Sequence, residues 1–306
     1  MDQIIVIANP VASQFTGGAH RDVMATLAKT HDVEAVWPAD TGETTTAASD
    51  AASDGAKVVV AMGGDGLVHH VCQGLVGTDT ALAIIPVGTT NVVARLLDVP
   101  SRLSRAVRLI ERAAGTASIG SVRMKLGRGS TTTTHYSIFA AGFGLDAEVV
   151  VEADRDPYKK YRFGSVHYAR TAFRVGLGRF PGRKPHVSVT AGSHMAMAST
   201  VLIQFRSIYT YFGKIPLRIE RAQPSPMTVL TIDRLRRRRV PEIVAGAMTR
   251  KSLASISGIE VFRNLTSLEL AADPPVAVQA DGEALGLAER ADVEWVPNAL
   301  RVIRGP

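Results

Sequence analysis

The chain has very little cysteine, and it has no long apolar run and no low-complexity segment. It contains a single cysteine, Cys72, among 306 residues, which excludes a disulfide framework and any zinc cluster built from cysteines. One thiol favours a reducing compartment, so we expect a cytoplasmic protein. No stretch approaches the ~18 consecutive apolar residues that span a bilayer. The apolar run from Ile4 to Ala8 is also too short and lacks the basic flank of a signal peptide.

What is present is the composition of a folded protein with an excess of positive charge. Hydrophobic residues make up 46% of the chain and charged residues 21%, which is unlike a disordered chain. At 306 residues the chain is longer than a single core usually grows, which favours two domains. There are 35 Lys and Arg against 28 Asp and Glu, a net charge of +7. This excess favours anionic partners such as nucleotides, nucleic acid or a lipid surface.

Two segments concentrate the positive charge. Residues 157–184 contain eight Lys or Arg and no acidic residue, and Arg234 with Arg236–Arg239 forms a second cluster. A solvated surface and a patch for lipid headgroups explain these clusters equally well, and nucleic-acid binding is a distant third. Basic side chains near a bilayer contribute about 1 kcal/mol each to binding on anionic lipid. We therefore expect an anionic membrane surface as a partner and no nucleic acid.

The first third of the chain has the pattern of a parallel sheet flanked by helices. Four apolar runs are expected to be strands: Gln3 to Ala8, Val33 to Trp37, Lys57 to Met62 and Ala81 to Val87. A helix is expected from Thr44 to Ser53 and another from Leu67 to Leu75. Three strands lead directly into Asn9-Pro10, into Gly63 to Gly66 and into Gly88 to Asn91. Because ligands of open α/β sheets bind beyond the carboxyl ends of the strands, we expect these three loops to meet at one site.

Beyond about Ser118 the pattern changes to short Val, Ile and Thr runs separated by Gly, Pro and Asp. This pattern predicts a β-rich, sandwich-like second domain, with helices at Tyr158 to Leu177 and Val240 to Thr249. We place an α/β nucleotide-binding domain at residues 1–118, to which residues 298–306 could return. The β-rich domain then occupies residues 119–297.

The loop from Gly63 to Gly66 has the chemistry of a phosphate cradle. Its glycines follow a buried strand and precede a helix, so backbone amides can approach an anion without an intervening Cβ. Asp65 would repel a phosphate unless a divalent cation or a proton lay between them, and Mg²⁺ is the usual mediator. Taken alone, a Gly-Gly-Asp-Gly string is more often a plain turn.

The sequence from Gly63 to Val71 resembles the nucleotide-binding signature of the diacylglycerol kinase and sphingosine kinase family of lipid kinases. Five further segments resemble that family in the same order along the chain: Asn9-Pro10, Pro86 to Arg95, Ala141 to Ala147, Tyr209 to Leu217 and Asp281-Gly282-Glu283. Each segment is weak evidence alone, but six in the right order are strong. NAD kinases share the Gly-Gly-Asp-Gly loop, yet the last two segments favour the lipid branch.

This resemblance implies that ATP phosphorylates a lipid hydroxyl, with Asp65 and Glu283 as catalytic residues. Asp65 would also contact Mg²⁺ through Mg-ATP, and Glu283 would act as the base. The nucleotide-binding residues implied are Asn9, Pro10, Thr44, Gly63, Gly64, Gly66, Gly88, Thr89, Asn91 and Gly282. From the residues alone, Asp281-Gly282 is more simply a turn between two strands, Val276 to Gln279 and Ala284 to Leu287.

Three residues depart from the family pattern. The family usually has Glu at the position of His70, many bacterial members have Asp at Val92, and Asp is common where Ser118 stands. Each departure removes a carboxylate from the expected Mg²⁺ neighbourhood. A weak or inactive kinase that binds lipid or nucleotide is therefore the alternative to an active enzyme.

Simpler interpretations apply to several other residues. Adjacent helical residues face different directions, so we expect His69 and His70 to be solvent-exposed or capping residues and not metal ligands. Cys72 has apolar neighbours and is expected to be an inert buried thiol. Tyr209, Tyr211 and Phe212 could equally contact lipid or pack within a sheet.

The preferred acceptor is diacylglycerol, giving phosphatidic acid, because the resemblance is closest to bacterial members of the family. Ceramide, sphingosine and other long-chain alcohols are the alternatives, since apolar pockets do not reveal the lipid that they bind. We expect ATP and Mg²⁺ as cofactors, and a role in phospholipid biosynthesis. The protein is expected to associate peripherally with the inner face of the membrane, and a homodimer is left open.

Overall fold

The computed structural model describes most of the chain, which divides into two compact units. The described residues are 2–112, 116–155, 170–172, 174–176, 178, 182–212, 215–219, 226–249 and 253–306. Unit 1 comprises Met1–Ser121 and Val296–Pro306, and unit 2 comprises Val122–Trp295. Independent folding of two domains, which the predicted boundaries imply, stays a prediction.

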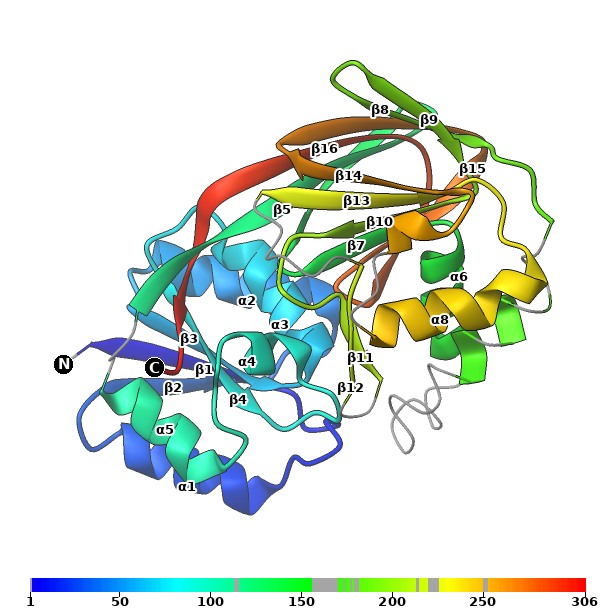
Figure 1. Cartoon of the computed structure of the whole chain (residues 1–306). Helices are drawn as coiled ribbons and strands as arrows, with labels where there is room; N and C mark the ends of the chain where they lie inside the picture. The colour runs from blue at the N-terminus through cyan, green and yellow to red at the C-terminus, as the bar shows by residue number, and fades with distance from the viewer. Residues whose placement is uncertain are drawn as a thin grey trace. The chain divides into compact units, whose positions relative to one another are not determined.

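Unit 1 is built on a parallel sheet of apolar strands (Figure 1). These strands are β1 (Gln3–Ala8), β2 (Asp32–Val36), β3 (Val58–Gly63) and β4 (Ala81–Pro86). They lie in the order β4-β3-β1-β2, and the last residues of β16 (Glu283–Ile303) pair with β4 in parallel. The predicted strands are confirmed to within one residue at each end. Strands β1, β3 and β4 are almost entirely buried, as expected where helices cover both faces of a sheet.

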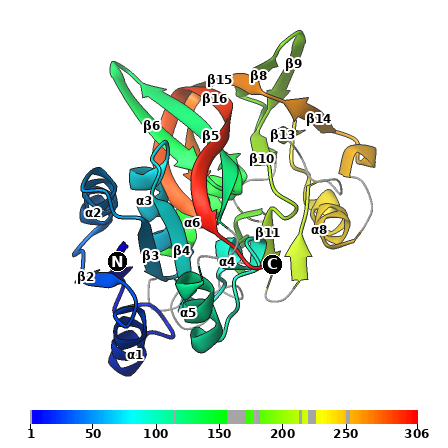
Figure 2. The ribbon, with the colours of Figure 1, turned by 90° about the vertical axis from the view of Figure 1, so that its left-hand side faces the viewer.

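Two pairs of helices cover this sheet. Helices α1 (Gly17–Leu27) and α5 (Leu103–Glu111) contact each other on one face, and α2 (Thr41–Ser53) and α3 (Asp65–Leu75) contact each other on the opposite face (Figure 2). Asp40 caps α2, since its Oδ1 accepts a hydrogen bond from the N–H of Glu43 at 2.8 Å. Glu43 Oε2 accepts in return from the N–H of Ala39 at 2.8 Å. This reciprocal cap begins α2 three residues before the predicted start at Thr44.

Unit 2 is β-rich, as predicted. Its strands are β5 (Thr116–Arg128, of which the first residues belong to unit 1), β6 (Thr131–Ser137), β7 (Ala140–Phe143), β8 (Val187–Ala191), β9 (His194–Ala198), β10 (Thr200–Gln204), β11 (Thr210–Phe212), β12 (Ile215–Leu217), β13 (Met227–Ile232), β14 (Ile259–Leu265) and β15 (Ser267–Ala280), together with most of β16. The main path is β14-β13-β10-β7-β15-β16, and the hairpins β5–β6 and β8–β9 pair with β16 and β15. One hydrophobic core includes side chains from most of these strands.

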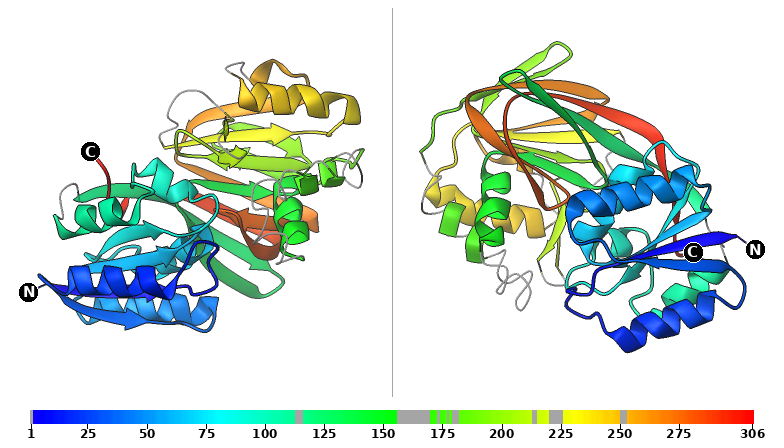
Figure 3. Two further views of the ribbon diagram at one scale, coloured as in Figure 1. Left: turned by 90° about the horizontal axis from the view of Figure 1, so that it is seen from below. Right: turned by 180° about the vertical axis from the view of Figure 1, so that it is seen from behind.

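The described helices of unit 2 lie outside its strands (Figure 3). They include α6 (Leu145–Asp154), α8 (Val240–Met248) and the short 3₁₀ helices η1 (Arg237–Arg239) and η2 (Leu253–Ser255). Residues 170–172 and 174–176 are also helical. Helix α8 confirms the prediction at Val240 to Thr249, whereas most of the predicted helix from Tyr158 to Leu177 lies outside the described residues. In the part of the chain that the structure describes, no helix is both long and apolar enough to cross a membrane.

Candidate active site

The loops that follow β3 and β4 touch through two glycines. A Cβ on Gly88 would lie only 2.5 Å from the Cα of Gly64, and a Cβ on Gly64 would lie 3.3 Å from the Cα of Gly88. The Gly88 distance is too short for any real side chain, so this approach requires glycine at position 88. The N–H of Val87 also donates to the carbonyl of Gly63 at 3.0 Å. Two of the three predicted loops are therefore in backbone contact at the carboxyl edge of the sheet.

The loop after β1 is hydrogen-bonded to the loop after β4. Gln14 donates its backbone N–H to the carbonyl of Val87 at 2.9 Å and its side-chain Nε2 to the carbonyl of Gly88 at 2.9 Å. The hydroxyls of Ser13 and Thr89 lie 3.0 Å apart. These bonds bring the third predicted loop to the same edge of the sheet as the other two.

Asn9 and Asn91 shape two of these loops through side-chain hydrogen bonds. Asn9 Oδ1 accepts from the N–H of Val11 at 3.0 Å and closes a turn that leaves Pro10 exposed. Asn91 has a φ of 50°, a left-handed conformation that asparagine tolerates better than most residues. Its amide donates to the Gly88 carbonyl at 2.8 Å and its Oδ1 accepts from the Gly88 N–H at 3.1 Å. Asn9 therefore fixes the backbone of the loop after β1, and Asn91 fixes the backbone at Gly88.

Asp65 joins the start of one helix to the start of another. Helix α3 begins at Asp65 and not at the predicted Leu67, so Asp65 and Gly66 belong to its first turn. The N–H groups of a first turn lack partners within the helix and favour a bound anion. Asp65 Oδ1 accepts a hydrogen bond from the N–H of Val93 at 3.1 Å, in the first turn of α4 (Val92–Leu96). One carboxylate thus connects the loops that follow β3 and β4.

Thr44 differs from the other candidates of unit 1, because its side chain is buried and forms a hydrogen bond at the start of its own helix. It is 4% exposed, and its hydroxyl donates to the carbonyl of Asp40 at 2.8 Å. Its placement gives no support of its own to a nucleotide contact, which stays a prediction.

Glu283 and Gly282 belong to a tight turn in unit 2. Asp281 and Gly282 have φ values of 54° and 85°, as in the two-residue turns that favour Asp-Gly. Glu283 is half-buried, begins β16 and pairs with Ala280 of β15. The turn interpretation is therefore confirmed, with strands longer than the two predicted, and it leaves the catalytic interpretation of Glu283 open.

Asp281, the other carboxylate of this turn, is a structural anchor. It is 3% exposed, and its Oδ1 accepts from the N–H groups of Ile138 at 3.0 Å and Phe139 at 2.9 Å. The Ser137 hydroxyl donates to the same oxygen at 2.8 Å. A carboxylate that accepts this many hydrogen bonds holds the turn between β6 and β7, and it is poorly placed to collect a proton from a substrate.

A buried polar cluster lies beside this turn. The hydroxyl of Tyr209 and the Nε2 of Gln279 both donate to Asp146 Oδ2, and Gln279 Oε1 accepts from the Gly282 N–H at 2.9 Å. A Cβ on Gly142 would collide with Asp146, so glycine makes room for the cluster. Burial raises the pKa of the Asp146 carboxyl above its ordinary value, although the bonds from Tyr209 and Gln279 oppose this shift. Burial and the neighbouring Asp146 raise the pKa of Tyr209 well above its ordinary value.

Comparison with known proteins identifies the loops of unit 1. Residues 3–122 match the model of the diacylglycerol kinase catalytic domain. These residues are similar to the diacylglycerol kinase family, whose model covers less than half of the chain. The predicted resemblance is therefore confirmed, and the predicted class of enzyme, a lipid kinase, is the class of this family.

Two relatives and one solved structure are also similar to the chain. The chain is 40% identical over 149 residues to a diacylglycerol kinase of Bacillus subtilis, covering 47% of this chain and 44% of the relative. It is 25% identical over 315 residues to a diacylglycerol kinase of Mycobacterium tuberculosis, covering 99% and 95%. The crystal structure of a diacylglycerol kinase from Bacillus anthracis superposes with a TM-score of 0.71 at 16% identity, covering 100% of this chain and 97% of that one. That likeness shows a shared fold.

The matched region is only part of several relatives. Other curated relatives are aligned over 31% to 55% of their own length, so the chain spans about half of them or less.

The positions that depart from the diacylglycerol kinase family pattern have different surroundings. Val92 is buried at the start of α4, His70 is half-buried on α3, and Ser118 is exposed on β5. The expectation that both histidines are exposed or capping is wrong for His69, which is 1% exposed within α3. Helix α3 packs on both α2 and the sheet, so its inward face includes His69. Cys72 is buried, as predicted.

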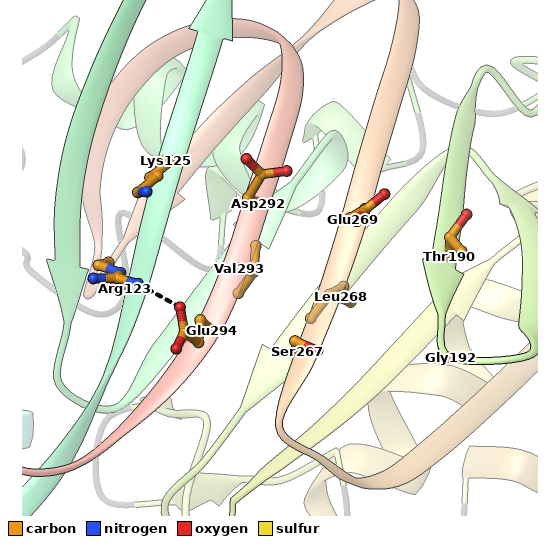
Figure 4. Close-up of a pocket in the computed structure, with 10 residues that line it drawn as sticks. All are labelled: Arg123, Lys125, Thr190, Gly192, Ser267, Leu268, Glu269, Asp292, Val293 and Glu294. Atoms are coloured by element: carbon orange, nitrogen blue, oxygen red, sulfur yellow. Dashed lines mark hydrogen bonds and ion pairs between the residues drawn. The ribbon is translucent and has the colours of Figure 1, made fainter.

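A cavity of about 400 Å³ opens in unit 2 between β5, β8, β15 and β16 (Figure 4). Its lining includes Arg123, Lys125, Glu269, Asp292 and Glu294. Arg123 of β5 and Glu294 of the neighbouring strand β16 form an ion pair at one side of it. An apolar lipid chain in this cavity would remove these charged groups from water, which is unfavourable. We therefore assign this cavity no role.

Part of the predicted basic surface is neutralised by acidic residues of α6. Arg174 forms an ion pair with Glu152 at 2.7 Å, and Arg183 forms one with Glu148. Most of the basic segment 157–184 lies outside the described residues. In the second cluster, Arg234, Arg236, Arg237 and Arg238 are exposed. The second cluster is therefore the better defined of the two basic surfaces.

Proposed function

We propose that this protein is an ATP-dependent lipid kinase that transfers the γ-phosphoryl group of ATP to a lipid hydroxyl. The observation that carries the proposal is the contact of Gly64 with Gly88, because glycines at the start of α3 let an anion approach the backbone amides of its first turn without an intervening Cβ. This contact lies within the matched catalytic domain. The nucleotide phosphates would lie at the start of α3, where the helix dipole also favours negative charge.

The residues of unit 1 fit a bound nucleotide better than they fit a metal held by protein alone. In the described part of the chain, no three His, Cys, Asp or Glu side chains come together in a way that could hold a metal ion. Mg²⁺ commonly needs only one or two carboxylates when substrate phosphates complete its coordination. Asp65 would supply that carboxylate, and the ion would neutralise charge on the phosphates during transfer.

Glu283 is proposed as the base that receives the proton of the lipid hydroxyl. The hydroxyl oxygen then bonds to the γ-phosphorus as the bond to the bridging oxygen of ADP breaks. Glu283 suits this role better than Asp281, because it is half-buried at the start of β16 while Asp281 is buried and saturated with hydrogen bonds. General bases of this kind contribute about 10²- to 10⁴-fold to a rate.

Diacylglycerol is the proposed acceptor, with phosphatidic acid as the product. The support is that relatives from Bacillus subtilis and Mycobacterium tuberculosis are both named diacylglycerol kinase. Ceramide, sphingosine and other long-chain alcohols are the competing acceptors. Because such lipids are dissolved in a bilayer, the protein would work at the inner face of an anionic membrane, in phospholipid biosynthesis.

The alternative is a kinase fold that binds lipid or nucleotide with little catalysis. It is favoured by His70 and Val92, which depart from the expected family pattern of a carboxylate at each position. Retention of Asp65 and Glu283 favours the active enzyme.

A transfer assay separates these possibilities. The protein would be incubated with γ-labelled ATP, Mg²⁺ and mixed micelles, each set containing diacylglycerol, ceramide, sphingosine or a long-chain alcohol. Labelled phosphatidic acid is the expected product, and a different labelled lipid would correct the acceptor. Calorimetry with Mg-ATP provides the second measurement, since preferential binding to the folded state raises the melting temperature. ATP binding without any labelled lipid would establish the non-catalytic alternative, and no binding at all would refute the nucleotide site.

A further inference from the structure

Helix α8 presents an apolar face to solvent. Its residues Pro241, Val244, Ala245 and Met248 are all exposed, at the spacing of i, i+3, i+4 and i+7 that places side chains on one face of a helix. Val244 is 48% exposed and Met248 is 38% exposed. A helix at the surface of a soluble domain normally turns its apolar face inward, and α8 has apolar side chains on the outward face as well.

The opposite face of α8 packs against the rest of unit 2. The helix therefore cannot rotate about its axis to bury the exposed face. Val240 and Gly246 are buried, and a Cβ on Gly246 would lie 2.6 Å from the side chain of Leu253. The carbonyl of Ala247 accepts a hydrogen bond from the N–H of Arg218 at 3.1 Å, just beyond β12. These contacts hold α8 in one orientation.

A second element extends this apolar surface. Strand β12 contacts α8, and its first residue, Ile215, is 40% exposed (Figure 1). Ile215, Val244 and Met248 are three of the large exposed hydrophobic residues of unit 2, and they come from two elements in contact. We name these three residues with Pro241 and Ala245 the α8 face.

Positive charge directly precedes α8 in the chain. Helix η1 (Arg237–Arg239) runs straight into α8, and Arg236, Arg237 and Arg238 are exposed. Glu242 is the one acidic residue in the helix itself. Apolar side chains beside a run of arginines are the pattern of a helix that lies in the interface of an anionic bilayer, with apolar groups among the acyl chains and cations among the headgroups.

We propose that the α8 face and Arg236–Arg238 form the surface by which this protein binds an anionic lipid bilayer. The charge of the arginines selects a bilayer over a neutral apolar partner, and the proposed lipid substrate requires contact with a bilayer. The inference rests on the proposed function only in that last respect, because membrane binding can be measured without ATP or an acceptor lipid.

Vesicle sedimentation tests the proposal. The full chain would be mixed with phosphatidylcholine vesicles with and without phosphatidylglycerol, at several salt concentrations, with no ATP and no diacylglycerol. We expect binding to anionic vesicles that weakens as salt rises, because surface charges are screened beyond about 10 Å at 0.1 M ionic strength. Val244→Asn with Met248→Asn should reduce binding about tenfold or more at every salt concentration, since apolar burial is not screened. Arg236→Gln with Arg238→Gln should reduce binding about tenfold at low salt and little at high salt.

Matched controls distinguish binding through this surface from nonspecific binding to vesicles. Met195 and Met197 of β9 are 77% and 54% exposed, so Met195→Asn with Met197→Asn removes comparable apolar surface elsewhere in unit 2. Arg105→Gln with Arg108→Gln removes two exposed charges from α5 in unit 1. Both controls should bind as the unchanged protein does. Loss of binding in the controls equal to the loss in the α8 variants would overturn the proposal, as would absent vesicle binding by the unchanged protein.

The occupant of the α8 face is tested by sedimentation of the protein alone. If Val244→Asn with Met248→Asn converts a dimer into a monomer without vesicles and leaves vesicle binding intact, the face joins two copies of the chain and the bilayer proposal is wrong. A protein that binds vesicles through α8 yet labels no lipid would uphold this proposal and refute the proposed function.

Discussion

Asp65 and Val93 are joined by a hydrogen bond of 3.1 Å from the backbone N–H of Val93 to Asp65 Oδ1. This bond ties the first turn of α3 to the first turn of α4, so Asp65 contributes to structure as well as to the proposed Mg-ATP site. The two contributions can be separated, because an asparagine retains an acceptor oxygen and loses the charge.

We predict that Asp65→Asn and Asp65→Ala will differ in stability but not in their defect toward Mg-ATP. Without ligand, Asp65→Asn should retain the melting temperature of the unchanged protein. Asp65→Ala should lower the free energy of unfolding by about 1 kcal/mol, because it removes the acceptor that caps the Val93 N–H at the start of α4. Both should bind Mg-ATP more weakly by calorimetry. Normal Mg-ATP affinity in Asp65→Asn would show that the carboxylate is only a structural cap.

The contact of Gly64 with Gly88 yields a second prediction. A Cβ on Gly88 would meet the Gly64 Cα at 2.5 Å, so Gly88→Ala should push the two loops apart at a cost of roughly 1–3 kcal/mol. Both the melting temperature and the affinity for ATP should fall. Gly18→Ala is the matched control, because a Cβ there meets nothing within 4 Å. Unchanged ATP affinity in Gly88→Ala would remove the phosphate site from these loops.

The sheet of unit 1 could be predicted closely from the sequence, because each strand is marked by residues that are near one another in the chain. Each strand is a short apolar run, and the glycines of the loops after β3 and β4 lie within a few residues of the strand ends in sequence. The start of α3 was placed two residues late, since two glycines beside Asp65 conceal a helix start. The burial of His69 could not be predicted either, because it depends on α2 packing against α3.

The cluster around Asp146 was missed for a different reason. Asp146, Tyr209 and Gln279 are far apart in sequence, and the pairing of β7 with both β15 and β10 brings the segments around them together. Asp146 and Tyr209 did fall in segments that resemble the family, yet the pattern gave Asp146 no chemical role and left Tyr209 between lipid contact and sheet packing. The ion pairs of Arg174 and Arg183 with α6 were likewise invisible, because a segment without acidic residues can still be neutralised by another segment.

The raised pKa of Asp146 gives a third prediction, on stability. A carboxyl whose pKa is higher in the folded protein than in the unfolded chain binds more protons when folded. The contribution of Asp146 to the free energy of unfolding must then fall as pH rises from the ordinary carboxyl pKa through the raised value. Outside that window this contribution does not change with pH. Asp146→Asn keeps an acceptor for Tyr209 and Gln279 but cannot ionise. Urea unfolding from pH 4 to pH 8 should show a loss of stability with rising pH that is smaller in Asp146→Asn. Identical pH profiles would contradict the assignment.

The final prediction separates the two carboxylates of the turn that begins β16. Glu283 is half-buried, and Asp281 is 3% exposed and accepts hydrogen bonds from the backbone of Ile138 and Phe139. Glu283→Gln should therefore leave the melting temperature and ATP affinity nearly unchanged while turnover falls roughly 10²-fold or more, the usual scale for loss of a general base. Asp281→Asn should instead destabilise the fold, because its amide presents donors where the native carboxylate accepts, at a cost of about 1–3 kcal/mol.

Turnover with a saturating lipid acceptor and thermal unfolding, measured on both variants, decide the matter. Glu289→Gln is the control for charge, since Glu289 lies on the same strand and its Oε2 accepts from the N–H of Gly129 at 3.0 Å. It should retain full turnover. If Glu283→Gln kept near-normal turnover while remaining folded, Glu283 would not be the base. A water molecule would then be the better candidate, because the Asp281 carboxylate is committed to holding the turn between β6 and β7.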